Sequence, residues 1–234
     1  GRSTHLDGKL PMTSYEGWNY LHILMFVFWI GTDLGVFLSA KKATDPKLPF
    51  DARLMLMHWA MRIELLPRTM WKAALPLGVM LSVKLGLLEL SGVGITLVWL
   101  FTIAWWAVSM TGAYKYDQPI GMQLGKLNNY LTGIVGAGMI ALAVSSYLGN
   151  GPFTAEATWL LWKVGLYGLI NLMVIAMLVV FEPLGIAFAR MATEGSTPEL
   201  ENTIAVVMNR SAIVIWSTYG TIALVGFIGT AKVW

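Results

Sequence analysis

Four ionisable side chains interrupt stretches of sequence that are otherwise apolar: His22, Asp33, Lys84 and Lys163. An ionised group in the hydrocarbon of a bilayer costs a few kcal/mol, so each of these residues needs a structural or a chemical role. A neutral imidazole, or an amine that has lost its proton, is a nitrogen ligand for a metal ion. A carboxylate at membrane depth can carry protons. These four residues are therefore the candidate site residues.

His22 shares a helical face with two of its neighbours. Trp29 follows His22 by seven residues and Asp33 follows Trp29 by four, so at about 100° per residue all three lie on one side of a helix. Such a face is costly in contact with lipid and should point into a bundle. Trp29 then contacts the same site as His22. Asp33 lies deeper, where it is a candidate for a proton relay or a transport pathway.

Helix rise places three of the nitrogen-bearing side chains at a similar depth. His22 lies in the first turn of its span, Lys163 about one turn into its span, and Lys84 about two turns from the end of its span. All three are expected in the outer leaflet, and the sequence leaves their lateral separation open. Ordinary alternatives are a hydrogen-bonded interfacial histidine, lysines that snorkel to the headgroups, and a neutral Asp33 that packs helices.

The composition indicates that lipid is the solvent of this chain. Of the 234 residues, 56% are hydrophobic and only 12% are charged, whereas soluble domains carry about 25% charged residues. Several charge-poor stretches reach the roughly 20 residues that cross a bilayer. We therefore expect an all-α integral membrane protein. The absence of cysteine excludes disulfides and iron–sulfur clusters, and the small net charge of +3 indicates no nucleic-acid partner.

The predicted architecture is a bundle of about six transmembrane helices in a single domain over residues 20–234. The expected spans are 20–40, 70–90, 93–114, 127–148, 159–181 and 203–228. A polar, outward-facing N-terminal tail over 1–19 precedes them, without the residue order of a cleaved signal peptide. Between the first two spans, the segment about 50–66 predicts an amphipathic helix that lies at the membrane surface. Its expected apolar face consists of Leu54, Met57, Met61 and Leu65.

Basic residues predict the orientation of the bundle. Most Lys and Arg residues fall in the loops after the first, third and fifth spans, which the positive-inside rule assigns to the cytoplasm. Both chain ends then face outward, to the periplasm of what we expect to be a bacterial inner membrane. This requires an even number of spans, a condition that six spans satisfy.

Copper is an alternative cofactor suggested by the methionines of the amphipathic segment. Met55 and Met57 carry the soft sulfur ligands that copper(I) prefers, although Met at helical spacing usually packs against neighbours. The chain contains no phosphate-binding loop, catalytic triad or metalloprotease motif.

Three short motifs resemble a known group of membrane proteins. His22-Ile-Leu-Met-Phe-Val-Phe-Trp29-Ile-Gly31 resembles the His-x6-Trp-x-Gly opening of the haem-containing membrane protoporphyrinogen oxidase, the copper-resistance-D-like proteins and the membrane urate oxidase domain. Met61-Arg62-Ile-Glu-Leu-Leu-Pro67 and Ala74-Leu-Pro76-Leu-Gly78 are similar to the basic segment and Pro-containing second span of that oxidase. Trp159-Leu-Leu-Trp-Lys163-Val is similar to its Trp-Leu-x-x-Lys-Leu.

The resemblance implies a haem b site. In that family the first-span His and the Lys of the third motif are implicated as haem ligands or haem-site residues, and they correspond to His22 and Lys163. Two spans, roughly 93–148, intervene between the matching parts. Gly31-Thr-Asp33-Leu-Gly35 replaces the family's arginine-bearing motif, so the resemblance implies haem binding rather than porphyrinogen oxidation.

Two classes of function follow. The first is a membrane haem b protein that transfers electrons, as an oxidoreductase or as the membrane subunit of one, with other membrane subunits or a redox partner. The second is a transporter of copper or another small solute, or a non-catalytic assembly subunit of a larger complex. A transporter should require Asp33 and tolerate loss of His22. An assembly subunit should depend on close packing at Gly133, Gly136 and Ala137.

Overall fold

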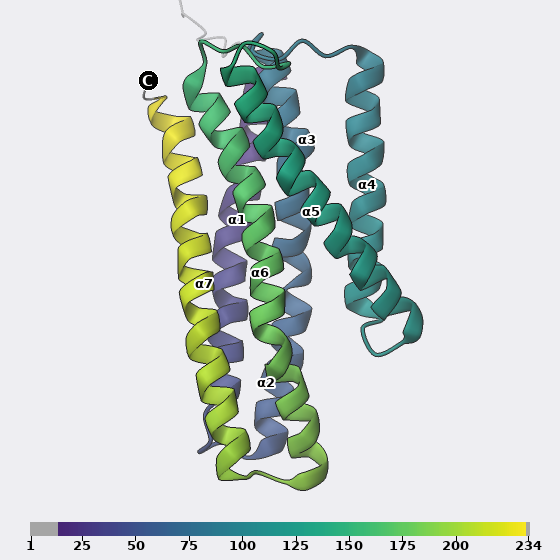
Figure 1. The fold of residues 1–234 in the computed structure, drawn as a ribbon, viewed down its shortest axis with the longest axis vertical. Coiled ribbons are helices and arrows are strands. Elements are labelled where there is room, and N and C mark those ends of the chain that lie inside the picture. The colour runs from purple at the N-terminus through teal and green to yellow at the C-terminus, as the bar shows by residue number, and fades with distance from the viewer. Residues whose placement is uncertain (1–13, 233–234) are drawn as a thin grey trace, which may run out of the picture.

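The computed structural model describes residues 14–232 of the chain, and this part contains seven helices. They are α1 (Ser14–Ala43), α2 (Phe50–Ile63), α3 (Leu65–Lys84), α4 (Gly92–Tyr114), α5 (Pro119–Tyr147), α6 (Thr158–Glu194) and α7 (Pro198–Ala231). The helices run up and down beside one another (Figure 1). In the described part the extended backbone amounts to one isolated bridge between Leu88 and Phe153. The predicted all-α membrane bundle is confirmed.

Five helices, α1, α4, α5, α6 and α7, are long and apolar enough to cross a membrane. Helix α3 runs alongside them (Figure 1) but carries Arg68 and Lys72 in its interior, which makes it less apolar. The count of six spans therefore stays a prediction. Helix α1 already begins at Ser14, inside the predicted tail, whose residues 1–13 lie outside the described part. Helix α3 ends at Lys84, well before the predicted boundary at residue 90.

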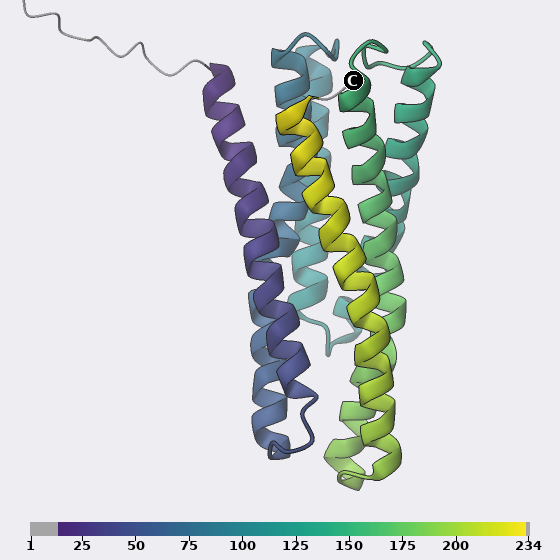
Figure 2. The same ribbon diagram turned by 90° about the vertical axis from the view of Figure 1, so that its left-hand side faces the viewer.

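Helix α2 continues almost directly into α3. Glu64, the residue between them, has helical dihedral angles of φ −59° and ψ −21°, and its N–H donates to the Ala60 carbonyl at 3.0 Å. Together α2 and α3 form a rod that lies along α1 (Figure 2). The sequence analysis instead expects this segment to lie across the membrane surface. The difference arises because one side of α2 packs against the other helices.

The buried stripe of α2 is out of register with the predicted apolar face. Arg53 and Ala60 are buried, and Leu56 and Met57 pack against the same core. Met61, which the sequence analysis placed on the apolar face, is exposed. The reason is that an arginine occupies one position of the stripe, which hides the helical period from an analysis of hydropathy.

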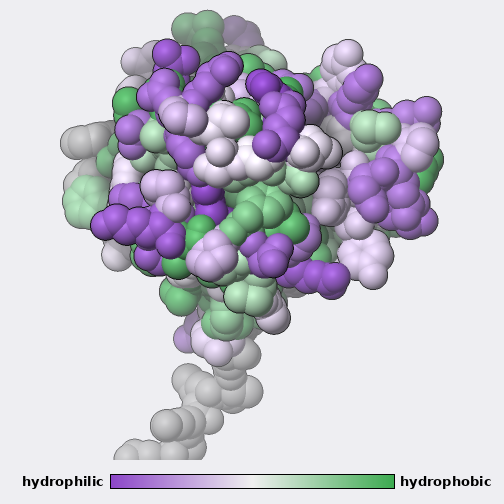
Figure 3. Space-filling view, turned by 90° about the horizontal axis from the view of Figure 1, so that it is seen from below, coloured by the Kyte–Doolittle hydropathy of each residue, from purple (hydrophilic) through white to green (hydrophobic). Residues whose placement is uncertain are grey.

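The helices differ in length, and the excess lies at one end. Helix α4 has 23 residues, about 35 Å, close to the roughly 30 Å of the hydrocarbon layer. Helices α6 and α7 have 37 and 34 residues, so each continues about 15–20 Å further. There they pack with α2 and the end of α1 (Figures 1 and 2). We call this part the extension, and its end the lower end. Seen from below, its surface is largely hydrophilic (Figure 3).

Exposed charges mark the lower edge of the membrane. The upper end of each helix is the end opposite the extension. When α4 to α7 are followed downward from their upper ends, the first exposed charged residue of each is Lys115 (directly after α4), Lys126, Glu182 and Arg210 in turn. Each lies between about 21 and 24 residues from the upper end of its helix, or about 32–36 Å. Above that level the one charged residue within these four helices is Lys163, which is not fully exposed. This charge-free surface matches the thickness of a bilayer core.

A buried ion pair holds the extension together. Arg53 of α2 is 2% exposed and its Nη1 lies 2.7 Å from Oε1 of Glu201 on α7. The second guanidinium nitrogen, Nη2, donates to Oε2 at 3.1 Å, and Nε donates to the carbonyl of Ala43 at the end of α1 at 2.8 Å. One side chain therefore connects three helices. Because α1 and α7 are joined at their lower ends in this way, their positions higher in the bundle are set relative to each other.

Two glycines allow α5 and α6 to approach closely. A Cβ built on Gly136 would lie 3.0 Å from the carbonyl oxygen of Gly168, and one built on Gly168 would lie 2.6 Å from that of Gly136. Of the other small residues expected to pack here, a Cβ on Gly133 would lie 3.5 Å from Ile175, and Ala137 is exposed. The close contact is thus centred on one glycine of each helix.

We expect Glu201→Ala to lower the free energy of unfolding by roughly 2–4 kcal/mol, because it leaves the buried Arg53 guanidinium without its carboxylate. Glu194→Ala is the matched control, since it breaks the half-exposed pair with Arg190 and should cost less than about 1 kcal/mol. Thermal unfolding of the protein in detergent measures both. Equal effects of the two substitutions would contradict the structural role given to Arg53.

We also expect Gly136→Val to destabilise the protein by about 1–3 kcal/mol, because the added atoms overlap the backbone of α6. Gly138→Val lies on the same helix, at a position where a Cβ meets nothing within 4 Å, and should have little effect. The same unfolding assay compares the two. A stable Gly136→Val protein would show that α5 and α6 do not pack as described.

Candidate functional site

A cavity of about 160 Å³ lies between the helices near the upper end of the bundle. His22 of α1 and Lys163 of α6 both line it, together with residues of α3 and α7. Helices remote in sequence thus bring together the two nitrogen-bearing side chains that helix rise places at equal depth. Trp29 also lines this cavity. We call it the upper cavity.

The imidazole of His22 has an unused ring nitrogen. Its Nδ1 is buried and finds no hydrogen-bond partner among the residues that the structure describes. A buried polar atom without a partner costs free energy comparable to a lost hydrogen bond. The amine of Lys163 belongs to the wall of the same cavity. A nitrogen in this condition, beside a cavity, is available to a ligand.

Lys163 extends from α6 towards α7. Its Nζ lies over Gly229, so close that a Cβ at this position would overlap the amine. The absence of a side chain on Gly229 therefore gives the amine its place. Lys232, one turn further along α7, also lines the cavity and is exposed, with its Nζ 5.7 Å from the ring centroid of Trp159. The upper cavity thus carries two amines on its α6–α7 side.

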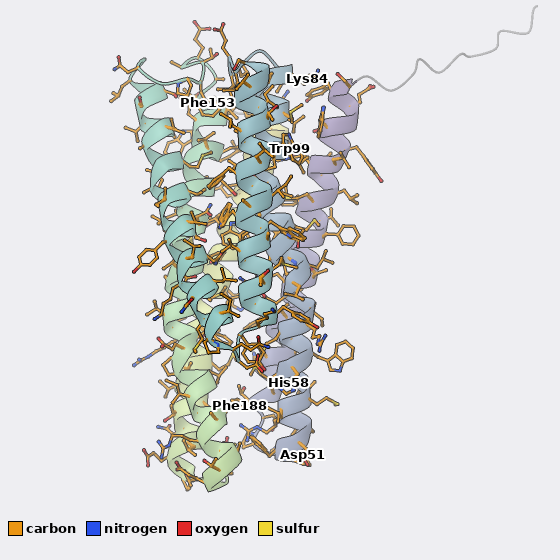
Figure 4. All side chains as sticks on the ribbon, turned by 90° about the vertical axis from the view of Figure 1, so that its right-hand side faces the viewer. Asp51, His58, Lys84, Trp99, Phe153 and Phe188 are labelled. Atoms are coloured by element: carbon orange, nitrogen blue, oxygen red, sulfur yellow. The ribbon has the colours of Figure 1, made fainter. Side chains whose placement is uncertain are left out.

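The remaining wall is mostly aromatic and apolar. It includes Met25, Phe26, Met139, Phe153, Trp159 and Tyr167. Phe153 comes from the loop between α5 and α6, at the upper end of the bundle (Figure 4). That loop is joined to the loop after α3, because the N–H of Thr154 donates to the carbonyl of Leu87 at 3.0 Å. The two loops together cover this side of the cavity.

Lys84 does not belong to the upper cavity, although the sequence analysis grouped it with His22. It is the last residue of α3 and is exposed at the upper end of the bundle (Figure 4). Ser82 and Leu85 line the cavity and Lys84 does not. The sequence placed Lys84 about two turns inside its span, whereas α3 ends at this residue, so its side chain lies at the end of the helix and not in the cavity wall. His58 is likewise separate, because it is exposed on α2 near the opposite end (Figure 4).

A second cavity, of about 60 Å³, lies deeper in the bundle and contains Asp33. The Asp33 carboxylate accepts a hydrogen bond from the hydroxyl of Tyr219 on α7, with 2.8 Å between Oδ2 and Oη. Glu64 and Arg68 line the same cavity and form an ion pair of 2.7 Å. Arg68 Nη1 also donates to Ser109 Oγ on α4 at 3.1 Å. We call this space the lower cavity.

Trp29 and Ile222 separate the two cavities, since both residues line both spaces. Both side chains are buried. The face of α1 that carries His22, Trp29 and Asp33 therefore points into the bundle, as its spacing predicts. His22 lies at the upper cavity, Asp33 at the lower cavity and Trp29 between them.

A fully buried lysine lies beside the lower cavity. Lys72 of α3 is 0% exposed, and its Nζ lies 3.8 Å from the ring centroid of Trp71 and 4.7 Å from that of Trp105. No hydrogen-bond acceptor for this amine is found in the part of the chain that the structure describes. The faces of two indole rings are the closest stabilising groups for an ammonium at this position. In the backbone of the same turn, Pro76 has no N–H to donate to the Lys72 carbonyl.

Sequence reasoning missed Glu64, Arg68 and Lys72 as site residues, because they were read as charges at the cytoplasmic surface. Their spacing of four residues was the available signal, since it places all three on one face of a helix. Tyr219 and Asn128, which also line the lower cavity, carried no such signal. Uncharged polar residues are common in membrane spans and do not by themselves mark a site.

The two methionines of the copper alternative lie apart on α2. Among the described residues, no three or more His, Asp or Glu side chains gather into a group that could hold a metal ion. Met55 is exposed, whereas Met57 packs against the core of the extension. Because the two sulfur-bearing side chains lie on different sides of α2, they do not form a common site.

Comparison with known proteins leaves the cavities as the main guide to function. No family model, no curated protein and no solved structure matches the chain. The resemblance to the haem-containing membrane proteins therefore stays a prediction, which rests on the motifs around His22 and Lys163.

Proposed function

We propose that the protein binds haem b in the upper cavity and transfers electrons through it, as a membrane oxidoreductase or as the membrane subunit of one. The observation that supports this most directly is the buried, unpartnered Nδ1 of His22 in a cavity shared with Lys163. Histidine is a common axial ligand of haem iron. A ligand on the ring nitrogen would also remove the cost of leaving it unpaired.

The wall of the upper cavity suits a tetrapyrrole in composition. Phe26, Trp29 and Phe153 offer apolar contacts for a flat macrocycle. Lys163 and Lys232 offer amines for its two carboxylate groups. Lys163 has two possible roles here, because a charged amine pairs with a carboxylate and a neutral amine binds iron. His22 is the proposed ligand in either case.

Bound haem would supply one-electron redox chemistry, with a potential set by its axial ligands and by burial. The chain's own residues would hold the haem and pair with its carboxylates. The loop that carries Phe153 would limit the access of water from the upper side. The upper cavity lies within the part of the bundle that spans the bilayer. By the positive-inside rule we propose that its open end faces outward, where a redox partner or another membrane subunit can approach.

A second candidate function is transport of a small solute. It is favoured by the two cavities that meet at Trp29 and Ile222 within the bundle. Such a protein would need Asp33 and would tolerate loss of His22, whereas a haem protein would show the reverse dependence. His22→Ala and Asp33→Asn, each compared with wild type for bound haem and for solute uptake, separate the two functions.

We expect the purified protein to show a Soret absorption band and extractable haem b, and His22→Ala to lose or shift that band because the axial ligand is gone. His58→Ala is the matched control, since His58 is an exposed histidine on α2 near the other end of the protein. Asp33→Asn should also retain haem. A wild-type protein that is colourless and yields no haem on extraction would rule out the proposal.

We expect Gly229→Ala to weaken haem retention by on the order of tenfold, because the new methyl group displaces the Lys163 amine from its place over α7. Gly220→Ala lies on the same helix, where a Cβ meets nothing within 4 Å, and should leave retention unchanged. Transfer of haem to an excess of an apoprotein acceptor measures both rates. Equal rates for the two variants would show that Lys163 does not contact the cofactor.

A further inference from the structure

Haem binding in the upper cavity leaves the carboxylate of Asp33 without a role. Its hydrogen-bond partner is the Tyr219 hydroxyl at 2.8 Å, and no ion pair to Asp33 is found among the described residues. The nearest cation lining the cavity, Arg68, is engaged by Glu64 through two nitrogens, at 2.9 and 2.7 Å, and by Ser109. A carboxylate at this depth without its own cation can lose its charge by binding a proton.

The titratable groups that face Asp33 are few. Helix α3 contributes Glu64 and Arg68, and α7 contributes Tyr219. Helix α5 contributes the amide of Asn128, and the lining residues of α6 are Val174, Met177 and Leu178, none of which titrates. Lys72 is buried beside the cavity against Trp71 and Trp105, but it is not part of the lining. Because Glu64 and Arg68 form an ion pair with each other, Asp33 is the charged group of the lining that has no ion-pair partner.

The lower cavity is suited to hold water. Its volume of about 60 Å³ would hold on the order of four molecules. Two polar atoms of its lining residues, Asn128 Oδ1 and Trp71 Nε1, are buried and have no hydrogen-bond partner in the described part of the chain. One is an acceptor and the other a donor, so ordered water can satisfy both. A chain of such waters would carry protons to Asp33.

Two charged residues of the lower cavity lie near the lower side of the membrane. Glu64 and Arg68 line this cavity and remain partly exposed, with side-chain exposures of 30% and 17%. Glu64 lies about 30 Å below the upper end of α3, which is close to the level where exposed charges begin on the other helices. Protons can therefore enter from the side that the basic loops identify as cytoplasmic.

We propose that the lower cavity is a proton-uptake site in which Asp33 binds and releases a proton, and that Trp29 and Ile222 form the barrier between it and the upper cavity. One proton enters from the lower side and forms an O–H bond on the carboxylate. The same proton leaves when water bridges the barrier, so no electron or other reactant is involved. The site would supply protons to chemistry in the upper cavity, and it does not depend on which cofactor that cavity holds.

The test uses the full-length protein in lipid vesicles with an entrapped pH-sensitive dye, a pH gradient and valinomycin with potassium to remove the electrical potential. Ile222→Ala removes aliphatic bulk from the barrier and should raise the rate of proton entry by about tenfold or more over wild type. Ile204→Ala is the matched control. Ile204 lies on the same helix, is equally buried, at 0% exposure against 2%, and lines neither cavity, so the rate should not change.

The dependence on Asp33 decides the proposal. Adding Asp33→Asn to Ile222→Ala should return proton entry to the wild-type rate, because an amide keeps the shape and the acceptor for Tyr219 but cannot carry a proton. Size-exclusion chromatography and thermal unfolding establish that each variant is folded. A folded Ile222→Ala protein without faster proton entry, or a fast rate that persists in the double variant, would overturn the proposal.

A second measurement leaves the barrier intact. In infrared difference spectra of the wild-type protein between high and low pH, Asp33 should contribute a carboxylic acid C=O band that is missing in Asp33→Asn. Its presence in both proteins, or in neither, would show that Asp33 does not bind the proton. Both readouts follow protons rather than haem, so the failure of this proposal and the failure of haem binding are distinguishable.

Discussion

Inside the hydrocarbon layer there is no water to satisfy a charge, and this constraint organises the bundle. Helices α4 to α7 expose no charged side chain between their upper ends and the level of Lys115 and Arg210. The ionisable groups that do occur within this layer, among them His22, Asp33 and Lys72, face the protein interior. Because such groups need partners and space, an interior that accommodates them is not tightly filled. The two cavities are the result.

This constraint on charged groups acts most strongly on helix α3. It holds an arginine, two lysines and an internal proline, and it is the least suited of the long helices to contact lipid. It lies between α1 and α4, whose side chains cover it. Ser109 of α4 accepts from Arg68, and Trp105 of α4 lies over Lys72. Both cavities border α3, which lines the upper one mainly with apolar residues and brings Arg68 to the lower one.

The extension outside the membrane supports the geometry inside it. Arg53 links α2 to the end of α1 and to Glu201 near the start of α7. Asp33 and Tyr219 lie higher on these same two helices and form a hydrogen bond. Above that contact the ring of Phe26 lies against Gly226. A series of contacts along α1 and α7 thus sets the height at which Trp29 and Ile222 meet, and with it the barrier between the cavities.

Local properties of the sequence determined the fold class, the approximate helix positions and the inward orientation of His22, Trp29 and Asp33. Hydropathy and helical spacing are contained in short segments, so they can be read without knowing which helices are neighbours. The shared depth of His22 and Lys163 follows from helix rise in the same way.

Tertiary structure alone decided the rest. Asp33 and Tyr219 are 186 residues apart, and the sequence contains no signal that α1 and α7 meet there. Lys84 was misplaced because the loop after it is apolar and extended the predicted span, whereas this loop pairs with the loop before α6. The sequence pattern predicted Arg68 and Lys72 to be surface charges, whereas in the structure α4 covers them. In each case the deciding contact joins separate segments of the chain, and the energy of such contacts depends on packing that no local pattern encodes.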